Sequence, residues 1–162
     1  MAWTYSLREL GEAIDKSGQG VETPCLGEGE TFHGVSTDTR TLEPGQVFFA
    51  LSGERFDGNT FVPKAFEKGA CAAVTQIPND AGPCLVVKDP LAALNAFAAF
   101  HRNQYSGPLF AVTGSCGKTT TKDFTAAVLS SRYNVVKTQG NLNNEIGCPL
   151  SLLRLNKTTG FG

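Results

Sequence analysis

The chain is poor in charged residues and in long apolar runs, and each shortage excludes a class of protein. Only 18% of its 162 residues are charged and 41% are hydrophobic, which is not the composition of a disordered tail. The formal net charge of −1 leaves no general basic field for binding nucleic acid. The most apolar stretch, residues 91–100, is about half the length that a membrane span requires.

The chain also lacks paired cysteines and a targeting segment. Its five cysteines are widely spaced, and none of them forms a C-x-x-C pair. An odd number of scattered cysteines predicts neither a disulfide framework nor a zinc site, and it fits a reducing compartment. The first residues do not have the basic and then apolar pattern of a secretory signal. We therefore expect a cytoplasmic protein without membrane insertion.

Apolar runs alternate with helical patterns in the first half of the chain. Ser6 and Glu9 fit a capping box at the start of a helix over residues 5–14. Three compact apolar runs are typical of buried strands, and a fourth segment has helical spacing with Gly69 placed to end it. This alternation predicts an α/β fold. The strands are expected at residues 46–51, 71–75 and 84–87, and the helix at residues 59–68.

A second unit is predicted from Asp89 onward, so the expected domains are residues 1–88 and 89–162. Asp89 is a suitable N-cap, with Pro90 in the first position of a long helix. A parallel nucleotide-binding sheet needs more strands than the two that we find in this unit, so we expect the chain to be a fragment. The further elements are a helix over residues 90–104, strands at 109–113 and 135–138, a helix at 121–131 and a loop passing into a helix over 143–155.

A glycine-rich turn follows the first strand of this unit. Its residues are Gly114, Ser115, Cys116, Gly117, Lys118, Thr119 and Thr120. Glycines allow main-chain amides to point into such a turn, and the helix that follows adds its positive end. We expect all seven residues to bind ATP, with Lys118 bridging the β- and γ-phosphates and the Thr119 hydroxyl on Mg²⁺, so both are candidate catalytic residues. The alternative is a chance Gly-Lys-Thr turn, which the flanking strand and helix argue against.

One residue of the turn has two interpretations, and the residues after it have one. Cys116 is either a tolerated small side chain or an alkylation-sensitive thiol that bound ATP would protect. Lys122 and Asp123 are interpreted as the solvated face of the helix after the turn.

His33 and His101 are isolated, and a structural or surface role is expected for each.

Three ordered motifs resemble those of the Mur ligase family. The resemblance covers nearly the whole chain and implies a small amino-terminal α/β domain for a UDP-sugar, followed by the incomplete start of a P-loop parallel-sheet ATPase domain. By comparison, the central acidic metal ligand, the carbamylated lysine, the adenine contacts and the amine-binding domain are missing. The motifs are VSTDTR at residues 35–40 with PGQVFFAL at 44–51 and GERFDG at 53–58, TGSCGKT at 113–119, and GNLNNEIG at 140–147 before Pro149 and Leu150.

The resemblance implies an ATP- and Mg²⁺-dependent amide ligase of peptidoglycan precursor synthesis. The loop at residues 140–147 is most similar to the branch that joins D-alanyl-D-alanine to UDP-N-acetylmuramoyl-tripeptide through an acyl phosphate. We expect a monomer that is inactive by itself. The alternatives are the sibling ligase that adds the third peptide residue, a non-catalytic UDP- or ATP-binding module and, least favoured, a small P-loop kinase.

The resemblance also implies substrate-binding roles. Arg40 and Arg55 are candidates for the UDP diphosphate, because a guanidinium group binds phosphate oxygens bidentately. The uridine end is assigned to Ser36, Asp38, Phe56 and Asp57, and the phosphates and muramyl peptide to Asn141, Asn143 and Asn144. Structural alternatives are a turn at Asp38 with Arg40 as its partner, core packing of Phe56, a turn at Asp57 and helix capping by the asparagines.

Overall fold

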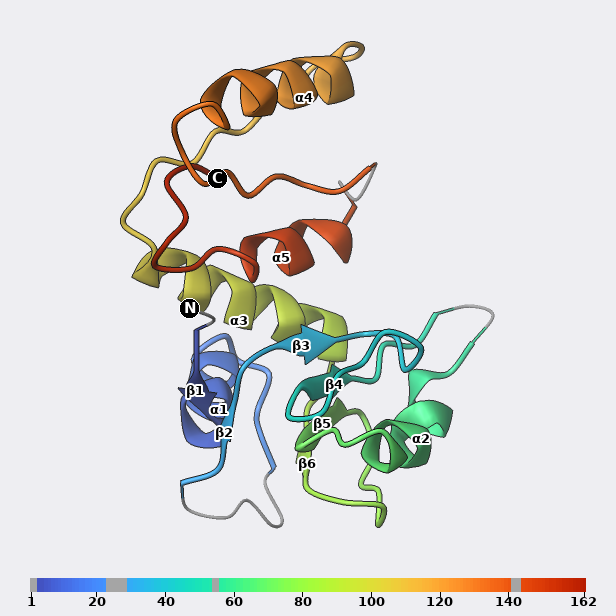
Figure 1. Ribbon diagram of the computed structural model, residues 1–162. Coiled ribbons are helices and arrows are strands. Elements are labelled where there is room, and N and C mark those ends of the chain that lie inside the picture. The colour runs from blue at the N-terminus through green and yellow to red at the C-terminus, as the bar shows by residue number, and fades with distance from the viewer. Residues whose placement is uncertain (1–2, 23–28, 54–55, 141–143) are drawn as a thin grey trace. The chain divides into compact units, whose positions relative to one another are not determined.

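The computed structural model describes residues 3–22, 29–53, 56–140 and 144–162 (Figure 1). Its contacts form two compact units, one ending at Phe97 and the other running from Ala98 to Gly162. Helix α3, Pro90–Gln104, contributes residues to both units. The domain boundary that we expect at residues 88–89 stays a prediction.

The first unit is built on a four-stranded parallel sheet in the order β3-β4-β5-β6. Strands covered on both faces consist of nearly continuous apolar residues, which is why three of these four could be located from the sequence. The predicted α/β class is confirmed. The strands are β3 (Val35–Ser36), β4 (Val47–Phe49), β5 (Ala72–Thr75) and β6 (Cys84–Val86).

Helices flank this sheet, and α1 and α2 lie on opposite sides of it (Figure 1). Helix α1 spans Leu7–Asp15 and begins with the predicted capping box, in which Ser6 Oγ accepts from the Glu9 amide at 3.2 Å. The predicted helix at residues 59–68 is a 3₁₀ turn, η1 (Gly58–Phe61), that continues into α2 (Val62–Glu67). In the described parts of the chain, no helix is both long enough and apolar enough to cross a bilayer. Strands β1 (Tyr5–Ser6) and β2 (Thr31–Phe32) form a separate antiparallel pair.

The register of the sheet determines which side chains meet α2. Phe48, Ala73 and Cys84 are cross-strand neighbours in β4, β5 and β6. All three are buried in one cluster with Val62 and Ala65 of α2. Because successive side chains of a strand point to opposite faces, the next residue of each strand faces away from α2. The core of this unit therefore has two layers, one on each face of the sheet.

The second unit contains α4 (Lys118–Leu129), α5 (Gly147–Leu152) and the segments that connect them. The strands predicted at residues 109–113 and 135–138 do not form a ladder. Only one parallel bridge, Val135 with Phe161, occurs in this part of the described chain. The Phe110 amide donates to the Gly162 carbonyl and the Val136 amide to the Phe161 carbonyl, both at 2.9 Å. A strand requires a neighbour along its length, and residues 160–162 supply one to these segments at only a few positions.

His101 lies in the buried part of α3 that belongs to the second unit, where its Nε2 is 2.8 Å from the Leu155 carbonyl oxygen. Burial lowers the pKa of His101 below its ordinary value of 6.5. Between the folded-state pKa and 6.5, the unfolded chain therefore binds more protons than the folded chain. The free energy of unfolding should fall as the pH drops through 6.5 toward the folded-state pKa.

We expect a His101→Gln variant to lose part of this pH dependence. Urea unfolding at about pH 7 and about pH 5 measures the effect, with the exposed His33 replaced by Gln as the matched control. The same acid-induced loss of stability in the wild type and the His101 variant would contradict the prediction.

Candidate functional site

The glycine-rich turn at residues 114–117 ends where α4 begins. Gly117 is the N-cap residue of α4 and has a left-handed backbone (φ +77°, ψ −4°), a conformation that glycine adopts without a Cβ penalty. No side chain in the described structure caps this end of the helix. The first amides of α4 therefore have no side-chain acceptor, and they form a site that favours an anion. The helix begins at Lys118, three residues before the predicted start.

Lys118 directs its ammonium group back over the turn, where Nζ donates to the carbonyl oxygen of Gly114. The side chain thus places a positive charge beside the glycine-rich turn. Thr119 and Thr120 follow in the first turn of α4 and are exposed. Main-chain amides, an ammonium group and hydroxyl groups are the donor set that a nucleotide triphosphate with Mg²⁺ requires.

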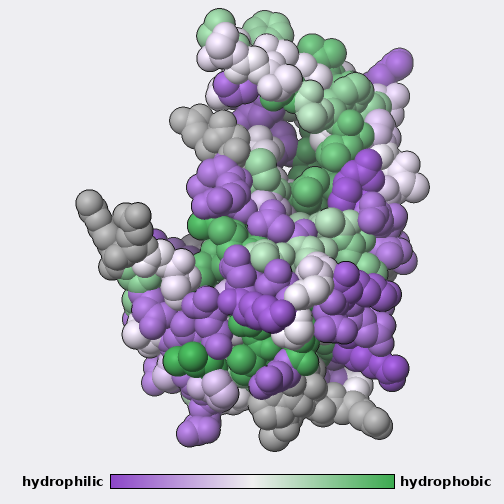
Figure 2. Space-filling view, turned by 180° about the vertical axis from the view of Figure 1, so that it is seen from behind, coloured by the Kyte–Doolittle hydropathy of each residue, from purple (hydrophilic) through white to green (hydrophobic). Residues whose placement is uncertain are grey.

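A cavity of about 350 Å³ lies beside this turn, within the second unit. Lys118 and Thr119 line it together with Thr138, and its walls are mainly apolar. Figure 2 shows hydrophobic side chains gathered in the part of the molecule that contains α4. The apolar walls include Leu109, Phe110, Val112, Leu129 and Leu152.

Asp123 is exposed, as predicted for the solvated face of α4, but Lys122 is not. The Lys122 side chain is only 18% exposed, and Nζ donates to the carbonyl oxygens of Thr138 at 2.9 Å and Gly140 at 3.1 Å. Asp123 accepts from Lys137 Nζ at 2.6 Å, a hydrogen bond that lowers the pKa of Asp123. Helical periodicity does not show that a long side chain can reach a segment about 16 residues away, so the sequence pattern missed this contact.

The second group of predicted site residues follows strand β3. Ser36 is buried, and its hydroxyl group donates to the Asp38 carbonyl oxygen at 2.9 Å. The Asp38 carboxylate accepts from both the side chain and the amide of Arg40, and these hydrogen bonds lower the pKa of Asp38 to about 2. The structure thus contains the turn that we gave as the structural alternative. The Arg40 side chain is nevertheless 85% exposed, so part of its guanidinium group faces solvent.

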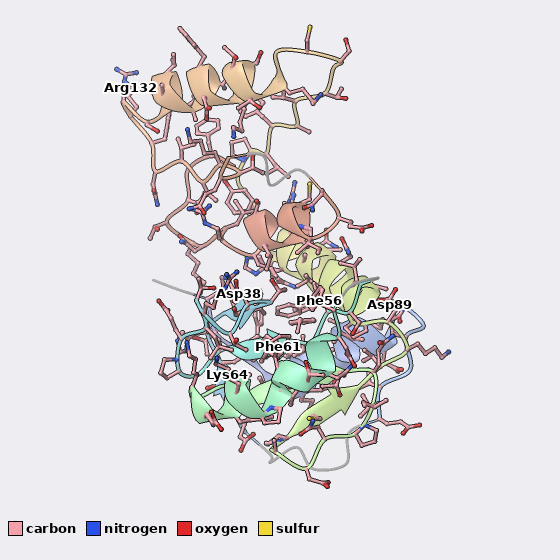
Figure 3. The ribbon with its side chains drawn as sticks, turned by 90° about the vertical axis from the view of Figure 1, so that its right-hand side faces the viewer. Asp38, Phe56, Phe61, Lys64, Asp89 and Arg132 are labelled. Carbon is pink, nitrogen blue, oxygen red and sulfur yellow. The ribbon has the colours of Figure 1, made fainter. Side chains whose placement is uncertain are left out.

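The loop after β4 contains the remaining predicted residues of the first unit. Asp57 caps η1: it accepts from the Asn59 amide at 2.9 Å and from the Ser52 hydroxyl at 2.8 Å, and its pKa is lowered, mainly by the Asn59 amide. Phe56 is 54% exposed and is therefore not a core residue. Asp38 and Phe56 lie on the same side of this unit (Figure 3), as expected for loops that leave the carboxyl ends of parallel strands. Arg55 lies outside the described residues.

Of the three predicted asparagines, only Asn144 belongs to the described chain. Its side-chain oxygen accepts from the Gly147 amide at 2.8 Å, and its carbonyl oxygen accepts from the Cys148 amide at 3.0 Å. The side chain thus accepts from the first amide of α5, although the N-cap residue of that helix is Ile146. This local contact is close to the helix-capping alternative that we considered. Asn141 and Asn143 lie outside the described residues.

Thr119 is the one predicted metal ligand. Within the described ranges, no group of three or more His, Cys, Asp or Glu residues is placed to hold a metal ion. The hydroxyl group of Thr119 fits a Mg²⁺ ion that is held mainly by phosphate oxygens and water, because Mg²⁺ commonly keeps such ligands. The metal role of Thr119 and the ligand roles of the other predicted residues stay predictions.

Two family models match the chain. The model described as "Mur ligase family, catalytic domain" matches residues 31–102, and the model described as "Mur ligase middle domain" matches residues 112–161. The first covers the sheet and the loops after β3 and β4, and the second covers the glycine-rich turn, α4 and α5.

Named relatives agree with these models. The chain is 46% identical over 136 residues to the UDP-N-acetylmuramoyl-tripeptide–D-alanyl-D-alanine ligase of Bacillus subtilis, covering 82% of this chain and 30% of that protein. A crystal structure of MurF from Acinetobacter baumannii matches 99% of this chain and 35% of that chain, at 33% identity and a TM-score of 0.86. The MurF ligase of Thermotoga maritima in complex with ADP matches 78% of this chain and 30% of that chain, at 34% identity and a TM-score of 0.70.

The chain therefore spans about a third of the length of the relatives that it matches. The similarity includes both compact units, and the predicted resemblance is confirmed by the family models, a curated relative and solved structures. The chain belongs to the Mur ligase family.

Proposed function

We propose that this chain is the UDP-sugar-binding and ATP-binding part of a cytoplasmic ligase that joins D-alanyl-D-alanine to UDP-N-acetylmuramoyl-tripeptide. The observation that carries the proposal is the glycine-rich turn at the start of α4, in a chain 46% identical to a ligase of that name. The sibling ligase that adds the third peptide residue remains the alternative within the family.

The second unit is assigned to ATP and Mg²⁺. Bound Mg·ATP would supply the phosphoryl group that activates the tripeptide carboxylate. The first amides of α4 and the Lys118 ammonium group would hold the phosphates, and the Thr119 hydroxyl group would contact the metal ion. Their task is to place several negative charges close together, so positive charge and amide dipoles are the main requirement.

The first unit is assigned to the sugar nucleotide. Ligands of parallel sheets bind outside the carboxyl ends of the strands, where Ser36, Asp38 and Phe56 lie. Arg40 is held by Asp38 at 2.6 Å, which orients its guanidinium group, while its exposure leaves donors for a diphosphate. The exposed ring of Phe56 offers a face for a uracil base.

Binding of UDP-N-acetylmuramoyl-tripeptide to this chain tests the proposal by calorimetry. We expect Arg40→Ala to weaken binding about tenfold, as loss of a charge-assisted hydrogen bond does. Arg8→Ala is the matched control, because Arg8 is also exposed and pairs with an acid, Glu12, at 3.0 Å.

Two results would contradict the proposal. One is a wild-type chain that binds neither this sugar nucleotide nor ATP. The other is equal weakening by Arg40→Ala and Arg8→Ala, which would indicate a general effect of charge rather than a site. Phosphate release that depends on D-alanyl-D-alanine is expected only when the rest of a ligase is supplied, because this chain spans about a third of its relatives.

A further inference from the structure

We propose that Lys122 is a positioning residue, which holds residues 137–140 against α4 and so fixes that segment beside the phosphate-binding turn. The inference rests on the proposed function, because the turn is assigned to ATP there. It adds a role for a residue that is not among the predicted ligand-binding residues and that the sequence pattern places in solvent.

The contacts of Lys122 are main-chain contacts. Its ammonium group donates to the carbonyl oxygens of Thr138 and Gly140, at 2.9 Å and 3.1 Å. An ammonium group has three donors, and the Asp123 carboxylate lies 3.6 Å away. With only 18% of the side chain exposed, these oxygen atoms replace most of the water that a surface lysine would keep.

Asp123, the residue after Lys122, also contacts residues 137–140. Asp123 accepts from Lys137 Nζ at 2.6 Å, and the Lys137 carbonyl oxygen accepts from Arg154 at 3.1 Å. Consecutive residues of α4 thus bind consecutive parts of residues 137–140, and Arg154 binds the same segment. The Lys122 contacts are the more buried of the two attachments to α4, and each is a hydrogen bond from a charged donor.

The position of Lys122 on α4 links this attachment to the turn. Lys118 and Lys122 are four residues apart, so they lie on one face of the helix, one turn from each other. Both line the 350 Å³ cavity, as do Thr138 and Gly140. The segment that Lys122 holds therefore forms part of the wall of the space that opens beside the phosphate-binding turn.

This geometry separates positioning from direct anion binding. Both lysines donate to carbonyl oxygens, but Lys122 donates to Thr138 and Gly140, whereas Lys118 donates to Gly114 within the turn that is assigned to the phosphates. Loss of the Lys122 ammonium group would leave two carbonyl oxygens without their donor and free the segment to move away from α4. Nucleotide affinity would then fall because the wall of the site is displaced.

Trypsin cleavage after Lys137 measures whether the segment is held, because the protease requires the segment to leave α4. We expect Lys122→Met to speed cleavage at this bond about tenfold, as loss of a hydrogen bond from a charged donor predicts. Lys122→Arg, which keeps charged donors, should cleave near the wild-type rate. Lys157→Met is the control, since Lys157 is exposed in the same unit, and cleavage after Lys16 is the internal standard.

Affinity for Mg·ADP, measured on the same variants by calorimetry, distinguishes positioning from simple structural support. The proposal expects weaker binding by about tenfold in Lys122→Met, with recovery in Lys122→Arg. Faster cleavage with unchanged ADP affinity would overturn the positioning role, and so would unchanged cleavage. A wild-type chain that binds no ADP would also contradict the assignment of the second unit to ATP, whereas normal ADP binding with unchanged cleavage would overturn this inference alone.

Discussion

Replacing Lys118 with alanine should weaken binding of Mg·ATP by roughly 100-fold, the upper range for loss of a hydrogen bond from a charged group. Lys118 is the first residue of α4, and its ammonium group bends back to the Gly114 carbonyl oxygen. That orientation places a positive charge beside the turn that precedes the helix. Alanine keeps the helix but removes the charge.

Calorimetry with Mg·ATP and, separately, with UDP-N-acetylmuramoyl-tripeptide provides the measurement and its control. The sugar-nucleotide affinity of the Lys118→Ala variant should equal that of the wild type, because the residues assigned to that ligand lie in the other unit. Lys157→Ala removes a charge from the same unit without touching the turn, and it should bind ATP normally. ATP affinity that is unaffected by Lys118→Ala would remove the role assigned to this residue.

Replacing Gly58 with valine should destabilise the first unit by about 3 kcal/mol, the upper range for overpacking. A Cβ atom on Gly58 would lie 2.2 Å from the Leu51 carbonyl oxygen and 2.6 Å from the Ala50 carbonyl carbon. Both are main-chain atoms of the two residues that follow β4, so no side-chain rotation relieves the overlap. The strand and the Asp57 cap must separate instead, which disturbs the loop assigned to the sugar nucleotide.

Gly11→Ala is the matched control for this substitution. A Cβ atom on Gly11 would lie 3.8 Å from Leu85 Cδ2, an ordinary contact, and Gly11 is in the interior of α1. Alanine there should stabilise the unit by roughly 0.5–1 kcal/mol. Urea unfolding followed by fluorescence of Trp3, the single tryptophan, reports on this unit because its ring packs against Phe32 and Phe97. A Gly58→Val variant as stable as the wild type would contradict the prediction.

The sequence predicted those elements whose causes are local. The capping box of Ser6 and Glu9 and the Asp89 cap, which accepts from the Leu91 amide at 2.8 Å, are each encoded within a few residues. The buried strands β4, β5 and β6 were located because strands covered on both faces are continuously apolar.

Elements that depend on distant partners were not predicted correctly. Residues 109–113 and 135–138 have the composition of strands, but a ladder requires a neighbouring strand along the whole segment. A local sequence pattern does not show whether such a neighbour is present. Lys122 was assigned to solvent for a related reason, since helix periodicity describes which face a residue occupies and not how far its side chain reaches.

The candidate site residues also divide into those that local sequence predicts and those that it does not. The phosphate-binding turn was predictable because glycine, lysine and threonine at the start of a helix have a direct physical meaning. Asp38, Asp57 and Asn144 were assigned to ligands, yet in the structure each makes local hydrogen bonds in a turn or helix cap. Asp and Asn form such caps in many loops, so their residue type alone does not separate a ligand contact from a cap.

The central claim is that the two units bind different nucleotides, and amide chemical shifts in an NMR titration test it most directly. Adding Mg·ADP should shift the amide signals of residues 114–120 and leave those of β3 to β6 unchanged. Adding UDP-N-acetylmuramoyl-tripeptide should shift the signals around Asp38 and Phe56 and leave residues 114–120 unchanged. Shifts from Mg·ADP that avoid the turn, or from both ligands at the same residues, would contradict the account.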